Sequence, residues 1–350
     1  MVCRAFGGPE ALQAEELPEP VPAPDEVLVS IRAAGVNFTD LLAVEGRSQL
    51  KRQLPIIPGT EAAGVIAALG ANVEGLRVGQ RVLATCIEGA FAERKCFRRD
   101  EVCPVPPEMA FATAAVFFIA SMTSHYALVE RAKLQPGETL LVLGAGSGVG
   151  LAAVEIGKAI GARVVAAASS EDKLQLALAR GADVAVRYQR GPLELEAQKQ
   201  FSRELRSAAG GAGRGPSIGQ LSTLGETGGY DVVYDAVGGT YSEPALRALG
   251  WEGRFLVIGF AAGMPSVTLG PALFKNADIM GVEPAADEHR LPGRNPAMME
   301  RLFGWYRDGH LKPQITARYP LELASDALRD LKERRAKGRI VLLVNDAARR

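Results

Sequence analysis

The sequence predicts a protein of mixed α/β class, with a Rossmann-type doubly wound parallel sheet and a second, β-rich, partly open barrel-like domain. Three observations predict this architecture. The first third consists of short apolar runs separated by prolines and glycines. From about residue 118, β-like runs alternate with helical segments. One such run, LLVL at 140–143, continues into the glycine-rich stretch GAGSGVG. A chain of 350 residues is long enough for two such domains.

The β-rich part is predicted from its turn residues. Apolar runs such as EVLVSIRAAGV (26–36) and GVIAALG (64–70) lie between stretches such as LPEPVPAPDE (17–26) and LRVGQRVLA (76–84). Short strands bounded by such turns are typical of sandwiches and barrels.

The alternating part predicts consecutive βαβ units. After the helical stretch ASMTSHYALVERAKL (120–134), strand-like and helical runs follow each other as far as RFLVIGF (254–260). Strands that alternate with helices form a parallel sheet. A charged, helix-like piece and a glycine-rich piece interrupt the alternation at 189–229, and we expect a surface excursion there.

Composition excludes several classes of protein. Lys plus Arg and Asp plus Glu both number 40, so no global charge would attract nucleic acid or an anionic membrane. No apolar run reaches the roughly 18 residues of a membrane helix, and the first residues lack the pattern of a signal peptide. We expect a soluble, cytoplasmic protein. The four cysteines form no CxxC pair and are interpreted as buried or idle thiols.

The stretch GAGSGVG (144–150) predicts a dinucleotide site. A strand that turns through glycines into a helix presents backbone N–H groups and the positive end of the helix dipole, which together bind a pyrophosphate. Gly146 and Gly148 would allow close approach, Ser147 and Val149 lie in the same turn, and Gly150 would let the helix pack on the sheet. The spelling is not a perfect GxGxxG, and the alternative is a tight connection without a ligand.

The next strand favours NADPH over NADH. A strand that serves NAD ends in an acidic residue for the ribose 2′-hydroxyl, whereas this one ends in Ser169 and Ser170. These hydroxyls, Lys173 and the phenol of Tyr188 are predicted to hold the 2′-phosphate of NADPH. The alternative is that the two serines only cap the following helix.

A series of stretches then follows one family's landmarks in order: AAGVNFTDLL (33–42), PGTEAAGVI (58–66), GAFAERKCF (89–97), the glycine-rich turn, SSEDKLQLALARGAD (169–183), YDVVYDAVGG (230–239) and GRFLVIGFAAG (253–263). Nearly the whole chain resembles the zinc-independent quinone oxidoreductases, the zeta-crystallin-like branch of the medium-chain dehydrogenase/reductase superfamily. The resemblance implies a catalytic GroES-like domain from residues 1–117 and 285–350, a Rossmann domain from 118–284, and a homodimer or homotetramer.

Zinc-dependent members of the same superfamily provide a test. Where they carry a cysteine and a histidine, this chain carries Asn37 and Thr60. Of the three histidines, His125 lies in the helical stretch before the glycine-rich turn, and His289 and His310 lie in the C-terminal third near no cysteine. The cysteines lack the close spacing of a structural zinc lobe. We therefore expect no zinc. Without a Lewis acid, the hydride acceptor must already be electrophilic, as quinones and conjugated enones are.

The resemblance also implies the site residues. Asn37 would contact the nicotinamide ribose or the acceptor, and Thr123 would lie against the nicotinamide. Further backbone contacts are implied at Val237, Gly238, Ile258, Gly259 and Phe260. Ser48 stands near the place of a tyrosine that donates a proton in related enoyl-thioester reductases, and serine is a weaker donor. Arg339 would approach a cofactor phosphate or lie exposed at the surface. Asp40 and Glu61 are expected to pair with an arginine rather than to act as acids. The acceptor wall, or alternatively the core, would include Phe38, Leu41, Leu50, Phe260 and Phe274.

Three functions stay open on the sequence. The first is an NADPH-dependent quinone or enone reductase. The second is a related reductase for another substrate class, such as an enoyl-thioester reductase or an alcohol dehydrogenase, which the missing tyrosine and the missing zinc ligands respectively oppose. The third is a non-catalytic NADPH-binding protein. A sheet edge between RFLVIGF (254–260) and ADIMGV (277–282) could pair across a twofold axis.

Overall fold

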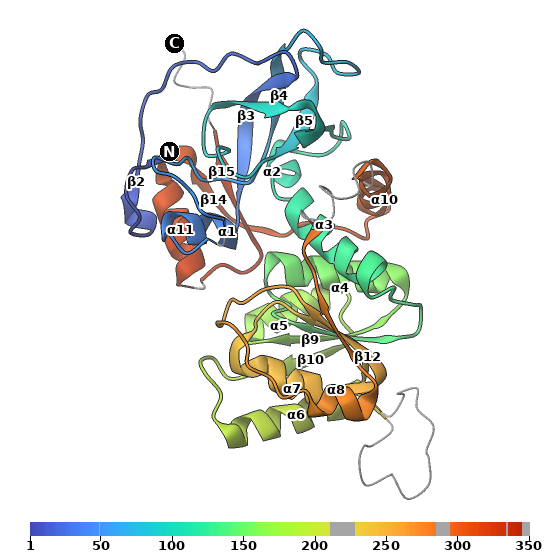
Figure 1. The fold of residues 1–350 in the computed structure, drawn as a ribbon. Coiled ribbons are helices and arrows are strands. Elements are labelled where there is room, and N and C mark those ends of the chain that lie inside the picture. Colours follow the sequence, from blue (N-terminus) through green and yellow to red (C-terminus); the bar gives the residue numbers. More distant parts are fainter. Residues whose placement is uncertain (49, 211–227, 285–294, 334, 345–350) are drawn as a thin grey trace, which may run out of the picture. The chain divides into compact units, whose positions relative to one another are not determined.

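The computed structural model describes residues 1–48, 50–210, 228–284, 295–333 and 335–344. The chain forms two compact units, Met1–Ile119 with Pro313–Arg350, and Ala120–Lys312 (Figure 1). Within the described residues, no helix is both long and apolar enough to cross a membrane.

The sheet of the first unit comes mainly from the turn-rich first third of the chain. Its strand order is β14–β15–β3–β4–β5–β7, and β6 also pairs with β3. Neighbours pair antiparallel except β14 and β15, which are parallel. The strands are β3 (Glu26–Val36), β4 (Glu61–Leu69), β5 (Arg81–Thr85), β6 (Arg94–Arg98), β7 (Val102–Pro104), β14 (Ile315–Pro320) and β15 (Arg339–Leu343). The described strands form an open path rather than a closed barrel, in agreement with the β-rich, partly open barrel-like domain that the sequence predicts.

Smaller elements complete this unit. β1 (Val2–Cys3) and β2 (Leu12–Gln13) form a separate pair. The helices are α1 (Phe38–Val44), α2 (Phe111–Ala114) and α11 (Ala324–Lys332), with single 3₁₀ turns at Pro9–Ala11, Arg99–Glu101 and Leu321–Leu323.

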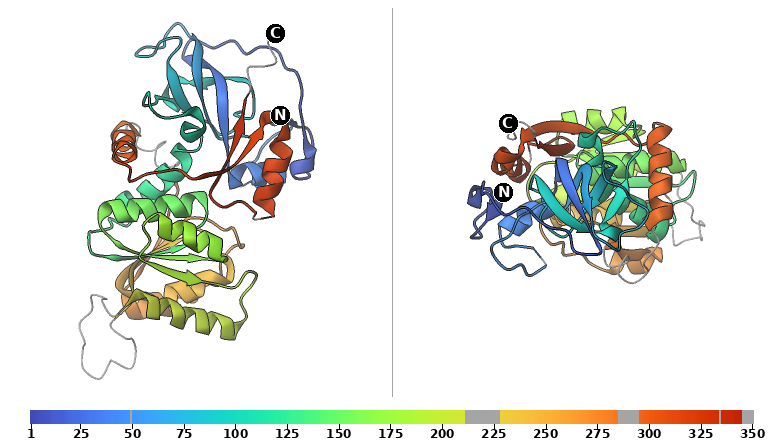
Figure 2. Two further views of the ribbon diagram at one scale, coloured as in Figure 1. Left: turned by 180° about the vertical axis from the view of Figure 1, so that it is seen from behind. Right: turned by 90° about the horizontal axis from the view of Figure 1, so that it is seen from above.

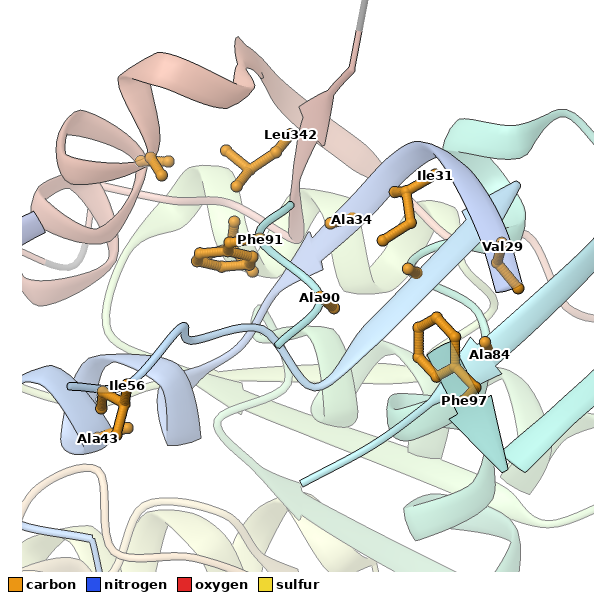
Figure 3. Close-up of a cluster of buried hydrophobic side chains, with 14 of the residues drawn as sticks. Val29, Ile31, Ala34, Ala43, Ile56, Ala84, Ala90, Phe91, Phe97 and Leu342 are labelled. Carbon is orange, nitrogen blue, oxygen red and sulfur yellow. The ribbon is translucent and has the colours of Figure 1, made fainter. Parts of the chain in front are cut away.

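The core of the first unit packs one face of the sheet against these helices and loops. Figure 3 shows Ile31 and Ala34 of β3, Leu342 of β15 and the loop residue Phe91 within this cluster, and all of them are at least 99% buried. β15 comes from the end of the chain but lies beside β3 from its beginning. Burial of these apolar side chains therefore holds both ends of the sequence in one unit.

The second unit contains the predicted parallel sheet. Its strand order is β10–β9–β8–β11–β12–β13, and every neighbouring pair is parallel. The strands are β8 (Thr139–Leu143), β9 (Arg163–Ala168), β10 (Val184–Arg187), β11 (Tyr230–Asp235), β12 (Leu249–Val257) and β13 (Asp278–Gly281). This is the Rossmann order 3-2-1-4-5-6, in which the crossover direction reverses between the first and fourth strands. The switch point thus lies between β8 and β11.

Helices cover both faces of the parallel sheet. Figure 1 shows α4 on one face and α6, α7 and α8 on the other. The helices of this part of the chain are α3 (Phe118–His125), α4 (Gly148–Ile160), α5 (Glu171–Ala179), α6 (Leu195–Ala209), α7 (Ser242–Arg247), α8 (Gly270–Lys275) and α10 (Asn295–Arg307). A π-helical turn at Tyr126–Arg131 continues α3, and a 3₁₀ turn at Gly239–Tyr241 precedes α7.

The first half of the 189–229 segment is not a surface excursion. It forms α6, which buries Phe201, Leu205 and Ala209 in the core of the second unit. The phenol of Tyr230, on β11, donates to the carbonyl of Leu205 at 2.7 Å. In the left view of Figure 2, α6 runs along one face of the parallel sheet. Residues 211–227, the glycine-rich half, lie outside the described residues.

The second unit extends to Lys312 and the first unit resumes at Pro313, whereas the expected position for this return is residue 285. Two contacts tie this stretch to the second unit. The ring of Trp305 in α10 lies 5.9 Å from that of His125 in α3. The N–H of Lys312 donates to the carboxylate of Glu155 in α4 at 3.2 Å.

Candidate active site

The glycine-rich turn connects β8 to α4 at the switch point of the sheet. Gly144 has φ 76°, which disfavours a residue with a side chain. Ser147 is the N-cap of α4, and its Oγ accepts from the N–H of Gly150 at 3.1 Å. A Cβ on Gly150 would lie 2.2 Å from the carbonyl oxygen of Gly144. Only glycine therefore allows this helix to begin so close to the strand.

The first turn of α4 has the donors that an anion needs. Ser147 satisfies the N–H groups of Gly150 and Leu151, through its Oγ and its carbonyl oxygen respectively. Gly148 and Val149 have no intrahelical acceptor for theirs. The dipole of the 13-residue helix adds positive potential at the same point. The turn can hold a pyrophosphate.

Lys173 lies directly over this turn. A Cβ on Gly146 would come within 2.5 Å of the Cβ of Lys173 and 2.6 Å of its Cγ, so a larger residue at 146 would displace the lysine stem. Ser169 and Ser170, both half-buried, connect the end of β9 to the start of α5. Ser170 is at the N-cap position of α5 without a side-chain capping bond. The stem of Lys173, three residues after Ser170, thus lies beside the glycine turn.

Tyr188, the fourth residue predicted for the 2′-phosphate, is placed differently. Only 8% of its surface is exposed. Its ring packs 4.8 Å from that of Tyr241 and 5.8 Å from that of Phe201, within the core of the second unit. Its ring is therefore a packing element.

The loops after β11 and β12 contain the residues whose backbone is predicted to contact the nicotinamide end, and backbone hydrogen bonds join the two loops. The carbonyl of Asp235 accepts from Ile258 and Gly259, and the carbonyl of Val237 accepts from Ala262 at 2.7 Å. Gly238 has φ 71°, and a Cβ there would lie 2.6 Å from the carbonyl oxygen of Gly263. The structure thus brings Val237, Gly238, Ile258, Gly259 and Phe260 together at the carboxyl edge of the sheet.

Thr123 is half-buried in α3, next to a residue that ties this helix to the dinucleotide turn. The Oγ of Ser124 donates to the carbonyl of Val149 at 2.9 Å and is hydrogen-bonded to the phenol of Tyr234 at 3.0 Å. Ser124 and Tyr234 are fully buried. Through these bonds, Thr123 has a fixed place relative to the start of α4 and to β11.

In the first unit, Asn37 belongs to a buried polar cluster. Its Nδ2 donates to Thr60 Oγ1 at 3.2 Å and to Glu61 Oε1 at 3.0 Å. The other carboxylate oxygen of Glu61 accepts from the N–H of Ile119 at 3.1 Å. Both hydrogens of the Asn37 amide are therefore used within this cluster. The side chain can offer a ligand a hydrogen-bond acceptor.

Arg339 completes this cluster. It is 7% exposed, and its guanidinium forms a buried ion pair with Glu61. The expectation that Glu61 pairs with an arginine is confirmed, and the alternative of an exposed Arg339 is wrong. Glu61 begins β4 and Arg339 begins β15, the two strands that flank β3, and a buried carboxylate is stabilised by a buried cation. Nε of Arg339 has no partner within the described residues. Contact with a cofactor phosphate stays a prediction.

Among the described residues, Asp40 has no salt bridge to an arginine. Its carboxylate accepts from the N–H of Asn37 at 2.8 Å and from that of Gly59 at 3.1 Å. Burial raises the pKa of Asp40 to about 7, against the opposing effect of these two backbone donors. The carboxylate fixes the start of α1 and so the position of Asn37.

The other predicted residues lie apart from this cluster or at the surface. Ser48 is half-buried, and its Oγ accepts from the N–H of Leu50 at 3.3 Å. Of the apolar candidates for an acceptor wall, Leu41 is in the core, whereas Phe38, Leu50 and Phe274 are exposed and Phe260 is half-buried. Phe274 belongs to α8.

Comparisons with known proteins identify the family. The alcohol dehydrogenase GroES-like domain family matches residues 23–136, and the zinc-binding dehydrogenase family matches residues 148–293. Quinone oxidoreductase-like protein 2 of Mus musculus is 32% identical over 343 residues, which cover 97% of this chain and 91% of the relative. The chain belongs to the quinone oxidoreductase branch of the medium-chain dehydrogenase/reductase superfamily. The resemblance inferred from the motifs is confirmed, and the chain is an oxidoreductase of this type.

Members with established names support the same assignment. Quinone oxidoreductase of Mus musculus is 28% identical over 346 residues and 96% of its length. The structure of Escherichia coli quinone oxidoreductase complexed with NADPH superposes with a TM-score of 0.82, at 27% identity and with 98% of both chains covered. The fold class predicted from the sequence is thereby confirmed.

The superfamily includes zinc enzymes, but the residues present do not fit a zinc site. Zinc is held by thiolate, imidazole and carboxylate donors. At the predicted position stand an amide and a hydroxyl, Asn37 and Thr60, and the amide donates to Glu61. In the described parts of the chain, no group of three histidine, cysteine or acidic residues could hold a metal ion.

Proposed function

We propose that the protein is a zinc-independent, NADPH-dependent reductase that transfers hydride to quinones or conjugated enones. The observation that carries the proposal is the turn at the switch point. There the first turn of α4 has N–H groups without an intrahelical acceptor, Lys173 lies over Gly146, and β9 ends in two serines instead of an acidic residue. The NADPH complex of the E. coli relative supports the choice of cofactor.

NADPH supplies the hydride when bound, and the residues of the chain bind and orient it. The N–H groups of Gly148 and Val149 would donate to the pyrophosphate. Ser169, Ser170 and Lys173 would hold the 2′-phosphate. Three partly hydrated phosphate contacts favour NADPH over NADH by about 2–4 kcal/mol, or roughly 30- to 1000-fold.

The Asn37 amide has a defined role in this proposal. Because its Nδ2 hydrogens are used by Thr60 and Glu61, its Oδ1 would accept a hydrogen bond from a ribose hydroxyl of the cofactor. It would not donate to the oxygen of the acceptor. The proton for the reduced acceptor would then come from solvent, which suits quinone reduction and leaves Ser48 a minor donor.

A panel of acceptors tests the proposal. Initial rates of NADPH oxidation would be measured with small quinones, a conjugated enone, an enoyl thioester and a saturated ketone. We expect turnover with quinones or enones and none with the ketone, which needs a Lewis acid. Preference for the enoyl thioester would favour the related reductase class, and NADPH binding without any turnover would favour the non-catalytic alternative.

We also propose that two copies associate through the edge of the parallel sheet. β13 is the last strand of that sheet and exposes Ile279. Beside it, α8 and its N-cap expose Leu269, Leu273 and Phe274, each more than 60% accessible. An unpaired edge strand with apolar neighbours is suited to pairing with its own copy across a twofold axis.

A further inference from the structure

Asp235 has a buried carboxylate, and no role was predicted for it from the sequence. It is the last residue of β11 and is only 2% exposed. In the sheet it stands opposite Leu143, the last residue of β8, directly before the glycine-rich turn. Asp235 therefore lies at the switch point, where open α/β sheets bind their ligands.

The carboxylate folds the loop that follows it. Oδ1 accepts from the N–H groups of Val237 and Gly238, both at 2.9 Å. Oδ2 accepts from the hydroxyl of Ser242, at the start of α7, at 2.5 Å. Burial raises the pKa of Asp235, and these three donors oppose that effect. An asparagine at this position would have a single side-chain oxygen and could not accept all three of these hydrogen bonds in the same way.

The main chain of the same residue holds the neighbouring loop. The carbonyl oxygen of Asp235 accepts from Ile258 at 3.0 Å and from Gly259 at 3.3 Å. One residue thus fixes both loops that were predicted to contact the nicotinamide end of the cofactor.

The two loops have little freedom to adopt another arrangement. Gly238 and Gly239 have φ of 71° and 57°, and a Cβ at either would lie within 2.7 Å of a carbonyl oxygen of the second loop. Close packing of this kind transmits a shift in one loop to the other.

We propose that Asp235 is a positioning residue for the nicotinamide end of the dinucleotide. By holding the 235–239 and 258–263 loops in register, it sets where the nicotinamide ring is presented to the acceptor. The inference rests on the proposed function, since it presumes that the switch point binds NADPH. A displacement of about 1 Å at a reacting centre can cost roughly 100-fold in rate.

The test compares two ligands that reach different distances along the site. NADPH would occupy both ends of it, whereas adenosine 2′,5′-bisphosphate would occupy the adenine end alone. For Asp235→Asn, we expect the Kd of NADPH to rise about tenfold, kcat to fall about 10- to 100-fold, and the Kd of the bisphosphate to change less than twofold. The fluorescence emission of bound NADPH should shift toward that of free NADPH.

Asp231→Asn is the matched control. Asp231 lies near the amino-terminal end of the same strand, whereas Asp235 is at its carboxyl end. The Asp231 carboxylate accepts from the N–H of Thr139 at 2.7 Å. The Asp231→Asn variant should leave the emission of bound NADPH unchanged, and also the ratio of the Kd of NADPH to the Kd of the bisphosphate. If Asp235→Asn does not fold, Ser242→Ala carries the test with the same pattern and a smaller change.

The outcomes separate this inference from the proposed function. If the wild-type protein binds neither ligand, the proposed function fails. If the wild type binds both, and the variants either match it or weaken both ligands equally, the positioning role of Asp235 is wrong while the proposed function stands.

Discussion

At the scale of single residues, the contact between Lys173 and Gly146 gives cofactor choice a structural basis. The lysine stem lies over the turn, and we propose that its ammonium binds the 2′-phosphate of NADPH. For Lys173→Ala, we expect the KM for NADPH to rise about 10- to 150-fold, the effect of losing one charged contact. The KM for NADH should change little. Lys199→Ala, on the exposed surface of α6, is the control; equal effects on both cofactors would remove Lys173 from the phosphate site.

His125 makes the stability of the second unit depend on pH. Its ring is 2% exposed and has no hydrogen-bond partner within the described residues. Burial, with the charge of Arg301, lowers the pKa of His125 to about 4. The unfolded chain binds the proton near pH 6.5, so stability falls as the pH drops from about 6.5 toward 4.

The expected size of this effect is about 2 kcal/mol between pH 7.5 and pH 5. His125→Phe keeps a ring against Trp305 and should lose less stability than the wild type over that range. Urea unfolding at the two pH values measures the difference. Identical pH dependence in both proteins would show that His125 is charged or solvated in the folded state.

Residue-level prediction from the sequence succeeded where the signal was local. The glycine turn and the serines follow from spacing along the chain. The burial of Arg339 does not, because its partner Glu61 is 278 positions away and neither residue has a local pattern that reveals the pair. Asp235 had a local signal that was overlooked: an aspartate before a glycine-rich turn bonds its own backbone two residues on.

At the scale of elements, the start of α4 depends on one glycine. For Gly150→Ala, the added Cβ would meet the carbonyl oxygen of Gly144, which is backbone and cannot move aside. We expect a loss of about 2–4 kcal/mol in the free energy of unfolding, together with weaker NADPH binding, because the helix must shift from the strand.

Gly304→Ala in α10 is the matched helical control. Nothing lies within 4 Å of its would-be Cβ, so it should stabilise the protein by about 0.5–1 kcal/mol. Thermal and denaturant unfolding measure both variants. If Gly150→Ala were as stable as the wild type, the claim that α4 packs closely against the turn after β8 would be wrong.

The elements themselves were largely predictable. The strand expected at 26–36 has those bounds as β3, and the alternation after residue 118 gives the parallel sheet. The misjudged element was α6. Its buried residues Phe201, Leu205 and Ala209 recur every four positions, a helical stripe, but the surrounding charges suggested an exposed segment. The spacing of residues along the chain does not determine the order of strands in the sheet. That order could be expected only from the predicted Rossmann class.

At the scale of the whole molecule, the exposed edge of the parallel sheet predicts a dimer. Ile279→Lys should convert the dimer into a monomer, because a charge on the edge strand opposes pairing. Val78→Lys, which changes an even more exposed apolar residue of the first unit, should leave the dimer intact. Light scattering after size-exclusion chromatography measures the mass; a monomeric wild type would contradict the proposal.

The central claim concerns cofactor and metal together, and one measurement tests both. Initial rates of NADPH and NADH oxidation would be measured with a small quinone, on protein treated with a strong chelator and on untreated protein. The account predicts a kcat/KM that favours NADPH by roughly 30- to 1000-fold and does not change with chelation. Equal use of both cofactors, or loss of activity on chelation that zinc restores, would contradict it.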